Sequence, residues 1–179
     1  MERETSSLLI KSNRVLGTRL VDAGLTNVED MDKANEVFIE LARAKDLNRA
    51  SLLRVLVYDH QTLKEESLLD YQLEKYPVGA VMLENYNIPE EVPGSQSLEL
   101  MRASWTIPYD FVNGRWFVAS AYYMSDVVRL FWEERLGGRV NWYVSSMNQL
   151  QWAFDSLSSK DAEAELAAAG NHQSNHEDA

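Results

Sequence analysis

The sequence contains no cysteine, and residues that interrupt regular structure are few, with 8 glycines and 4 prolines among 179 residues. Without cysteine the chain forms neither a disulfide scaffold nor a metal site with thiolate ligands. It also lacks the run of roughly 20 apolar residues that a transmembrane helix needs, and its first residues lack the apolar segment of a secretory signal. We therefore expect a cytoplasmic protein with no direct membrane insertion.

Basic residues are scarce as well. Lysine and arginine number 17 against 28 aspartates and glutamates, which gives a formal net charge of −11. Proteins bind nucleic-acid polymers mainly by neutralising phosphates with lysine and arginine, and no run of basic residues occurs here. We therefore expect no nucleic-acid polymer as a partner. The content of 45% hydrophobic residues is typical of a folded protein of one ordinary domain or two small ones.

The common catalytic and cofactor-binding motifs are missing. There is no Gly-x-x-x-x-Gly-Lys-Ser/Thr loop for nucleotide phosphates, no Gly-x-Gly-x-x-Gly turn for a dinucleotide, and no serine in a nucleophile elbow. The three histidines, His60, His172 and His176, have no further ligand at metal-binding spacing. These absences predict a protein that is not an enzyme, with no catalytic residue, no cofactor and no metal site.

Changes in composition divide the chain into four parts. Residues 8–88 have the apolar spacing of helices throughout, and residues 97–157 also contain strand patterns. Between them, residues 89–96 contain two prolines and a glycine, which indicates a linker. Residues 158–179 are acidic and contain one large apolar residue, Leu166, so they are too polar to bury a core. We expect two lobes joined by a linker, followed by a disordered acidic tail.

The first lobe contains an internal repeat with an offset of 36 residues. The matched positions are Leu16 with Leu52, Leu20 with Leu56, Thr26 with Thr62 and Glu29 with Glu65. Each copy has a helical segment, a short break and then an amphipathic segment, so we expect two helical hairpins that pack together. Two copies also fit a truncated solenoid, although neither has an evident cap.

Short motifs mark where these helices should begin and end. In each copy Thr-x-x-Glu forms a capping box at the start of the second helix, with Thr26 and Thr62 as the capping residues. Gly24 should end the first helix of copy one in the left-handed conformation, which glycine adopts with little strain. His60 takes the same place in copy two.

The second lobe contains the clearest strand signal. Asn113-Gly114 lies between two runs rich in β-forming residues, Trp105–Val112 and Arg115–Ala121, and this dipeptide favours a two-residue hairpin turn. Pro108 has no amide hydrogen to donate, so its strand should lie at an edge of the sheet.

Three further elements complete this lobe. A helix over residues 126–136 should start after Ser125 and stop at Gly137, a strand should follow at 140–144, and Ser146 should cap a last helix. With a short helix after the linker, the order is αββαβα, a three-stranded sheet covered by helices. The sequence therefore predicts an α+β fold in which an all-helical lobe precedes a small α+β lobe.

Three segments together resemble a known family. Residues 16–34 contain Leu-Gly-x-x-Leu-Val-x-x-Gly-Leu-Thr and then Glu-Asp-Met-x-x-Ala, residues 81–89 read Val-Met-Leu-Glu-Asn-Tyr-Asn-Ile-Pro, and residues 113–121 read Asn-Gly-Arg-Trp-Phe-Val-Ala-Ser-Ala. They are similar to the helical repeat, the strand before the second lobe and the hairpin strand of one domain. This is the N-terminal domain of type II secretion and type IV pilus assembly ATPases, including its cyclic-di-GMP-binding subgroup.

The resemblance implies a stand-alone, non-catalytic interaction domain, because this sequence contains no ATPase module. Its partner would be a protein at the cytoplasmic face of the inner membrane, in a secretion, pilus or polysaccharide export assembly. The alternative implied by the subgroup is a receptor that binds cyclic-di-GMP through the two helical repeats.

For that ligand the resemblance points to a set of candidate residues: Arg14, Leu16, Gly17, Arg19, Leu20, Gly24 and Arg54. Arginine suits guanine stacking and bidentate phosphate contacts. The chain departs from the subgroup at Val15 and Ser51, where each copy would open with arginine, and at Phe38, where copy one would end with glutamine. Tyr122-Tyr123 stand where the family often has Asp-Pro. Alternatively, the arginines are ordinary surface charges.

Overall fold

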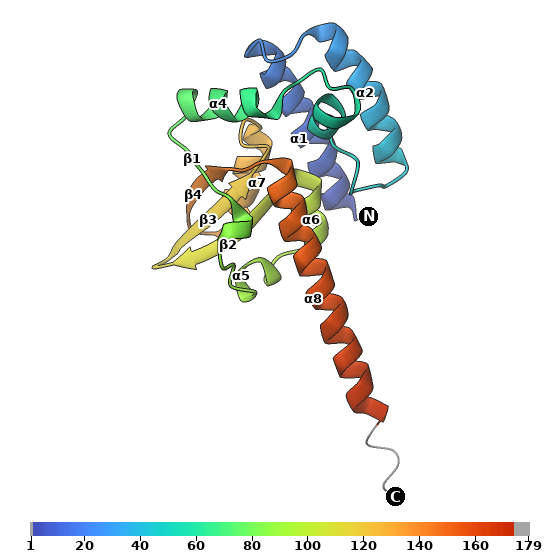
Figure 1. Ribbon diagram of the computed structural model, residues 1–179, viewed down its shortest axis with the longest axis vertical. Helices are drawn as coiled ribbons and strands as arrows, with labels where there is room; N and C mark the ends of the chain where they lie inside the picture. The colour runs from blue at the N-terminus through green and yellow to red at the C-terminus, as the bar shows by residue number, and fades with distance from the viewer. Residues whose placement is uncertain (1, 174–179) are drawn as a thin grey trace, which may run out of the picture.

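The computed structural model describes residues 2–173 and has an α+β fold, with N-terminal helices followed by a mixed four-stranded sheet and interspersed helices (Figure 1). The N-terminal helices are α1 (Arg3–Asp22), α2 (Val28–Arg43), α3 (Leu52–Arg54), the π-helix η1 (Val55–Asp59) that continues it, and α4 (Glu65–Lys75). The second helical pair, α3–η1 with α4, is therefore shorter than the first. The repeat-related leucines at positions 16, 20, 52 and 56 are all fully buried.

The turn between α1 and α2 forms as predicted at Gly24 but not at Thr26. Gly24 has a φ of +69°, and the amides of Gly24 and Leu25 donate to the carbonyls of Val21 and Leu20, which is a Schellman motif. The predicted capping box is wrong, because Asn27 caps α2 by accepting the Asp30 amide at 2.8 Å. The Thr26 hydroxyl is instead buried without a hydrogen-bond partner.

The second capping box is also wrong. Helix α4 starts at Glu65 with Lys64 at its N-cap, and no side chain caps it. The Glu65 carboxylate instead accepts the backbone amide of Met147 at 3.1 Å, at the start of a helix 82 residues later. His60 is right-handed, and Gln61 takes the left-handed place with a φ of +56°.

The sheet has one strand more than predicted. Its strands are β1 (Gly79–Ala80), β2 (Thr106–Val112), β3 (Arg115–Ser120) and β4 (Arg139–Val144), in the order β1-β4-β3-β2. Strands β2 and β3 are antiparallel, whereas β4 is parallel to both β3 and β1. Because β1 comes from residues predicted to be helical, the first lobe is not all-helical and the predicted three-stranded sheet is wrong.

The β2–β3 hairpin forms as predicted. Asn113 and Gly114 both have positive φ values, +52° and +74°, as a type I′ turn requires. Strand β2 lies at the edge of the sheet, which accommodates Pro108, and the register shifts between Pro108 and Asp110.

Helix α7 (Asp126–Leu136) connects β3 to β4 and ends at Gly137, which has a φ of +61°. As predicted, the helix starts after Ser125, which occupies the N-cap position, but the Ser125 hydroxyl makes no capping hydrogen bond and is buried without a partner. Ser146 does accept the Gln149 amide, at 3.3 Å, at the start of the last helix.

The predicted linker is structured. The short helices η2 (Leu83–Asn85) and α5 (Glu91–Gly94) precede α6 (Leu98–Ser104). Helix α5 packs against β2, and its Val92 and Pro93 are buried. Residues 89–96 are therefore part of the folded body.

The predicted disordered tail is wrong for the part that the structure describes. Helix α8 runs from Met147 to Gln173 and extends well beyond the body (Figure 1). Alanine and glutamate are good helix formers, and they continue a helix whose first turns are already fixed by packing. Residues 174–179 lie outside the described residues.

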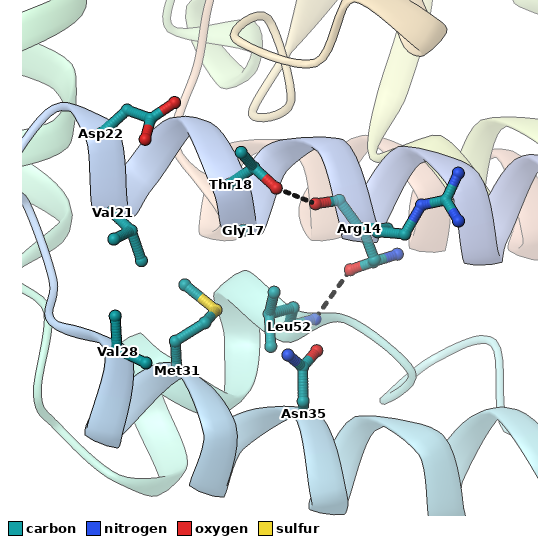
Figure 2. Close-up of a pocket in the computed structure, with 10 residues that line it drawn as sticks. Arg14, Gly17, Thr18, Val21, Asp22, Val28, Met31, Asn35 and Leu52 are labelled. Carbon is teal, nitrogen blue, oxygen red and sulfur yellow. Dashed lines mark hydrogen bonds between the residues drawn. The ribbon is translucent and has the colours of Figure 1, made fainter.

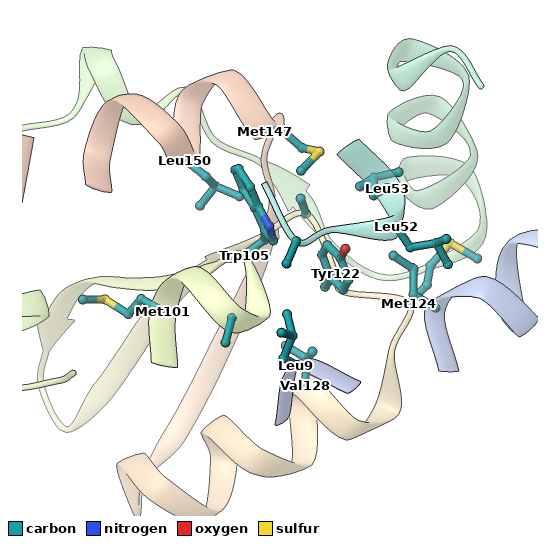
Figure 3. Close-up of a cluster of buried hydrophobic side chains, with 14 of the residues drawn as sticks. Leu9, Leu52, Leu53, Met101, Trp105, Tyr122, Met124, Val128, Met147 and Leu150 are labelled. Carbon is teal, nitrogen blue, oxygen red and sulfur yellow. The ribbon is translucent and has the colours of Figure 1, made fainter. Parts of the chain in front are cut away.

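One hydrophobic core spans both predicted lobes. Figure 3 shows Leu9 of α1 and Leu52 and Leu53 of α3 beside Tyr122 and Val128 of the second lobe. Helix α1 packs on both α6 and α7. The two predicted lobes therefore form one packed body.

Candidate functional site

The structure places two of the predicted ligand residues, Arg14 and Gly17, at one pocket. This pocket has a volume of about 290 Å³ and lies between α1, α2 and the start of α3 (Figure 2). Its lining residues are Asn13, Arg14, Gly17, Thr18, Val21, Asp22, Val28, Met31, Asn35 and Leu52. We call it the α1 pocket.

Gly17 allows the helices to approach closely beneath the α1 pocket. A Cβ atom added at Gly17 would lie 2.9 Å from Cδ2 of Leu52 and 3.1 Å from Sδ of Met31. Both neighbours are buried, so neither side chain can move aside without disturbing the core. The Leu-Gly motif therefore has a packing role in this chain.

The other five predicted residues lie elsewhere. Leu16 and Leu20 are fully buried in the core, and Gly24 forms the turn after α1. Arg19 faces α7, where its guanidinium lies 2.6 Å from the Asp126 carboxylate. Arg54 lines a separate polar hollow beside α8.

The Arg19–Asp126 ion pair predicts a small, pH-dependent loss of stability in Asp126→Asn. Hydrogen bonds from Arg19 and, to a smaller extent, from Arg129 lower the pKa of Asp126, so this contribution is present above the ordinary aspartate pKa and disappears as pH falls through the lowered one. Both side chains are more than a third exposed, which screens the pair. Thermal unfolding should show a melting temperature about 1–3 °C lower at pH 7 and no difference at pH 2. An equal loss at both pH values would contradict this origin.

A buried polar network joins the first helical pair to the sheet. The Tyr122 hydroxyl donates to Oδ1 of Asn13 at 2.7 Å and lies 2.6 Å from Oγ of Ser51. Asn13 Oδ1 also accepts the Leu52 amide at 2.8 Å. All three side chains are fully buried, and burial raises the pKa of Tyr122, so its hydroxyl stays protonated. Ser51, which stands where the subgroup has arginine, is thus occupied in a structural contact.

An apolar groove lies between the segment 86–90 and α8. It has a volume of about 230 Å³, and Ile107 forms part of its floor. Two aromatic side chains on its wall remain exposed, Tyr86 at 39% and Trp152 at 42%. An ion pair between Lys160 and Glu90, at 2.5 Å, borders it. We call it the Trp152 groove.

The Trp152 groove was not predicted from the sequence, because the segments that form its walls are more than 60 residues apart in the chain. One local signal pointed to it. In α8 the buried residues Leu150, Ala153 and Phe154 form the inward stripe, and Trp152 lies off that stripe. A large aromatic residue on the outer face of an amphipathic helix is a candidate contact residue.

Within residues 2–173, no group of three side chains is arranged to hold a metal ion, and no helix is long and apolar enough to cross a membrane. Glu65 is a half-buried carboxyl group whose pKa is raised by burial. Its oxygens face the Met147 amide and the Tyr58 hydroxyl, so it serves the start of α8.

No family model and no curated protein matches the sequence. Solved structures share its fold, among them the two that follow. The structure of MshE with cdg has a TM-score of 0.51 and 15% sequence identity, with 79% of this chain and 97% of that chain covered. The structure of the N-terminal domain of XpsE has a TM-score of 0.51 and 16% identity, with 76% and 89% covered.

These sequence identities are too low to show a shared function, so the structural similarity shows the fold alone. It includes both the N-terminal helices and the sheet, since it covers more than three quarters of the chain. The chain therefore has the fold of these two structures, as its sequence resemblance to the N-terminal domains of secretion and pilus assembly ATPases implied.

Proposed function

We propose that this protein is a non-catalytic interaction domain that docks on a protein at the cytoplasmic face of a secretion, pilus or polysaccharide export assembly. The Trp152 groove is the observation that carries the proposal. The likeness to the XpsE N-terminal domain and to MshE supports the cellular context.

The groove has the properties of a protein-binding surface. Tryptophan and tyrosine are enriched among the residues that dominate binding energy at protein interfaces, and here one of each is exposed beside an apolar floor. Two carboxylates near the groove have no ion-pair partner within the described residues, Glu84 on the adjoining segment and Asp110, which is bonded to the Tyr86 hydroxyl, whereas Lys160 neutralises Glu90. The matching partner segment would insert an apolar side chain and carry basic residues around it.

Affinity capture from the host cell tests the docking role. The wild-type chain and Leu130→Ser should recover the same component of a membrane-associated assembly, identified by mass spectrometry, and Trp152→Ser should recover at least tenfold less of it. Leu130 is the matched control because it is 65% exposed on a helix but lies outside the groove. Recovery of no such component, or equal loss in both variants, would contradict the proposal.

The second candidate function is cyclic-di-GMP binding at the α1 pocket. Arg14 and Gly17 of the Leu-Gly motif line that pocket, and the MshE structure with the same fold was solved with cdg. Against it, Arg19 and Arg54 point to other sites and Ser51 is fully buried. We therefore rank it below docking.

Calorimetry separates the two functions. If cyclic-di-GMP binds, ligand at 100 times its Kd should stabilise the protein by about 2.7 kcal/mol, and Arg14→Ala should weaken binding. The absence of both heat and a thermal shift at about 100 μM ligand would remove this candidate and leave docking untouched.

A further inference from the structure

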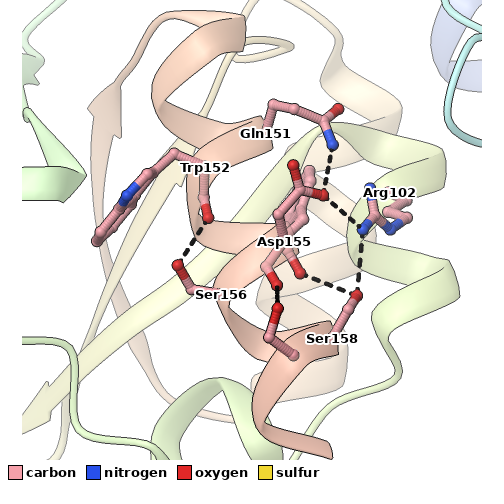
Figure 4. Close-up of polar contacts among 8 residues, drawn as sticks. Arg102, Gln151, Trp152, Asp155, Ser156 and Ser158 are labelled. Atoms are coloured by element: carbon pink, nitrogen blue, oxygen red, sulfur yellow. Dashed lines mark hydrogen bonds and ion pairs between the residues drawn. The ribbon is translucent and has the colours of Figure 1, made fainter. Parts of the chain in front are cut away.

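Three arginines line a polar hollow beside α8. Figure 4 shows one of them, Arg102, on the side of α8 away from Trp152. The hollow has a volume of about 600 Å³ and is lined by Asn48, Arg49, Arg54, Arg102, Gln151, Asp155, Ser158 and Ser159. These residues come from the loop before α3, from α3 itself, from α6 and from α8. None of them lines the α1 pocket or the Trp152 groove.

Arg102 is the fixed member of this cluster. Its side chain is only 13% exposed, and its guanidinium stacks over the Phe154 ring, 5.3 Å from the ring centroid. It donates to Oδ1 of Asp155 and to Oγ of Ser158, each at 3.3 Å. Gln151 also donates to Asp155, at 2.8 Å. The only carboxylate of the hollow is therefore already neutralised.

The other two arginines have no acidic partner within the described residues. Neither Arg49 nor Arg54 forms an ion pair there. Nε of Arg54 is buried and has no hydrogen-bond partner. A buried donor without a partner is costly. The Arg54 guanidinium lies over the Tyr58 ring, 5.7 Å from its centroid, but neither it nor Arg49 is neutralised by a carboxylate within the described residues, so the two form a local excess of positive charge.

The residues that line the hollow indicate which chemical class of ligand it would bind. Three guanidinium groups and the two amides of Asn48 and Gln151 supply hydrogen-bond donors around a single engaged carboxylate, a set that fits a multiply charged oxyanion. The Ser158 and Ser159 hydroxyls already donate to the backbone carbonyls of Phe154 and Asp155. No aromatic ring is among the described residues that line the hollow, so the lining favours the charged phosphate group of a ligand over an aromatic base.

We propose that this hollow binds a phosphate group, held by Arg49 and Arg54 and positioned against Arg102. The ligand would connect the loop before α3 to α6 and α8. This site is independent of the docking proposal, because the two surfaces lie on opposite sides of α8 and share no residue.

Calorimetry with the full chain and inorganic pyrophosphate, at constant ionic strength, tests the site. We expect one pyrophosphate per chain, and about tenfold weaker binding in Arg49→Gln and in Arg54→Gln, since each removes charged hydrogen bonds to the ligand. Arg115→Gln is the matched control, an exposed arginine on β3, and should bind like the wild type. Arg14→Ala should also bind like the wild type, which separates this site from the α1 pocket.

Two further probes distinguish the source of the phosphate. A phosphoserine peptide that binds more tightly than pyrophosphate, while its unphosphorylated form does not bind, would assign the site to a phosphorylated protein. The reverse order would assign it to a free anion. No heat with millimolar pyrophosphate, or equal weakening by Arg115→Gln, would overturn the proposal.

Discussion

Replacing Tyr122 with alanine is expected to lower the free energy of unfolding by about 3–5 kcal/mol, the usual cost of truncating a buried aromatic side chain. Tyr122 is fully buried where the helices meet the sheet, and its hydroxyl contacts both Asn13 and Ser51. The substitution leaves a cavity and removes one hydrogen-bond partner from each of two buried polar side chains, Asn13 and Ser51. Urea unfolding monitored by circular dichroism measures the change.

Two companion variants separate the causes. Tyr122→Phe keeps most of the volume and leaves Asn13 and Ser51 short of one partner, so it should cost about 1–3 kcal/mol. Tyr86→Ala removes a tyrosine that is 39% exposed and should cost less than Tyr122→Ala. A single transition should persist throughout, because one core joins the two lobes. A cost below 1 kcal/mol for Tyr122→Ala would contradict this account of the junction.

The second large effect is expected for Gly17→Leu. A Cβ alone would already lie 2.9 Å from Leu52 and 3.1 Å from Met31, and forcing side chains into a packed core typically costs about 1–3 kcal/mol or more. This penalty should exceed the gain of about 1 kcal/mol in helix propensity from removing a glycine. The same urea titration measures it.

Gly94→Leu is the matched control for this substitution. Gly94 is also helical, but nothing lies within 4 Å of a Cβ added there. We expect it to leave stability unchanged or slightly raised. If Gly17→Leu were as stable as Gly94→Leu, the close approach of α1, α2 and α3 would be wrong.

Features decided by local backbone chemistry could be predicted from the sequence. Gly24, Asn113, Gly114 and Gly137 all have the positive φ values that their turns and helix ends require. Pro108 lies on an edge strand because only an edge tolerates its missing amide hydrogen.

Features that depend on contacts between residues far apart in the sequence could not be predicted. Strand β1 has two residues and exists because Gly79 and Ala80 lie beside the end of β4. The sequence places Glu65 in a local capping box, but its carboxylate accepts the backbone amide of Met147. Asn27 and Thr26 are both possible caps for α2, and the chain uses Asn27.

Among the candidate site residues, too, some positions could be predicted from sequence spacing and others could not. Arg14 and Gly17 lie three residues apart, which puts them on one side of a helix, and the structure brings them to one pocket. Arg19 is five residues beyond Arg14, so it faces α7 instead. Arg54 joins Arg49 and Arg102 through contacts between α3, α6 and α8 that no sequence spacing reveals.

Site-specific photo-cross-linking from position 152 in the host cell tests the docking role most directly. A photoreactive residue with an aromatic side chain in place of Trp152 keeps an aromatic contact at this position and should yield a cross-linked product that contains a protein of a secretion, pilus or export assembly, and the same residue at Leu130 should not. Both positions are exposed on helices, so they differ mainly in whether they border the groove. Equal labelling from both positions, or no product from position 152, would contradict the assignment of this surface.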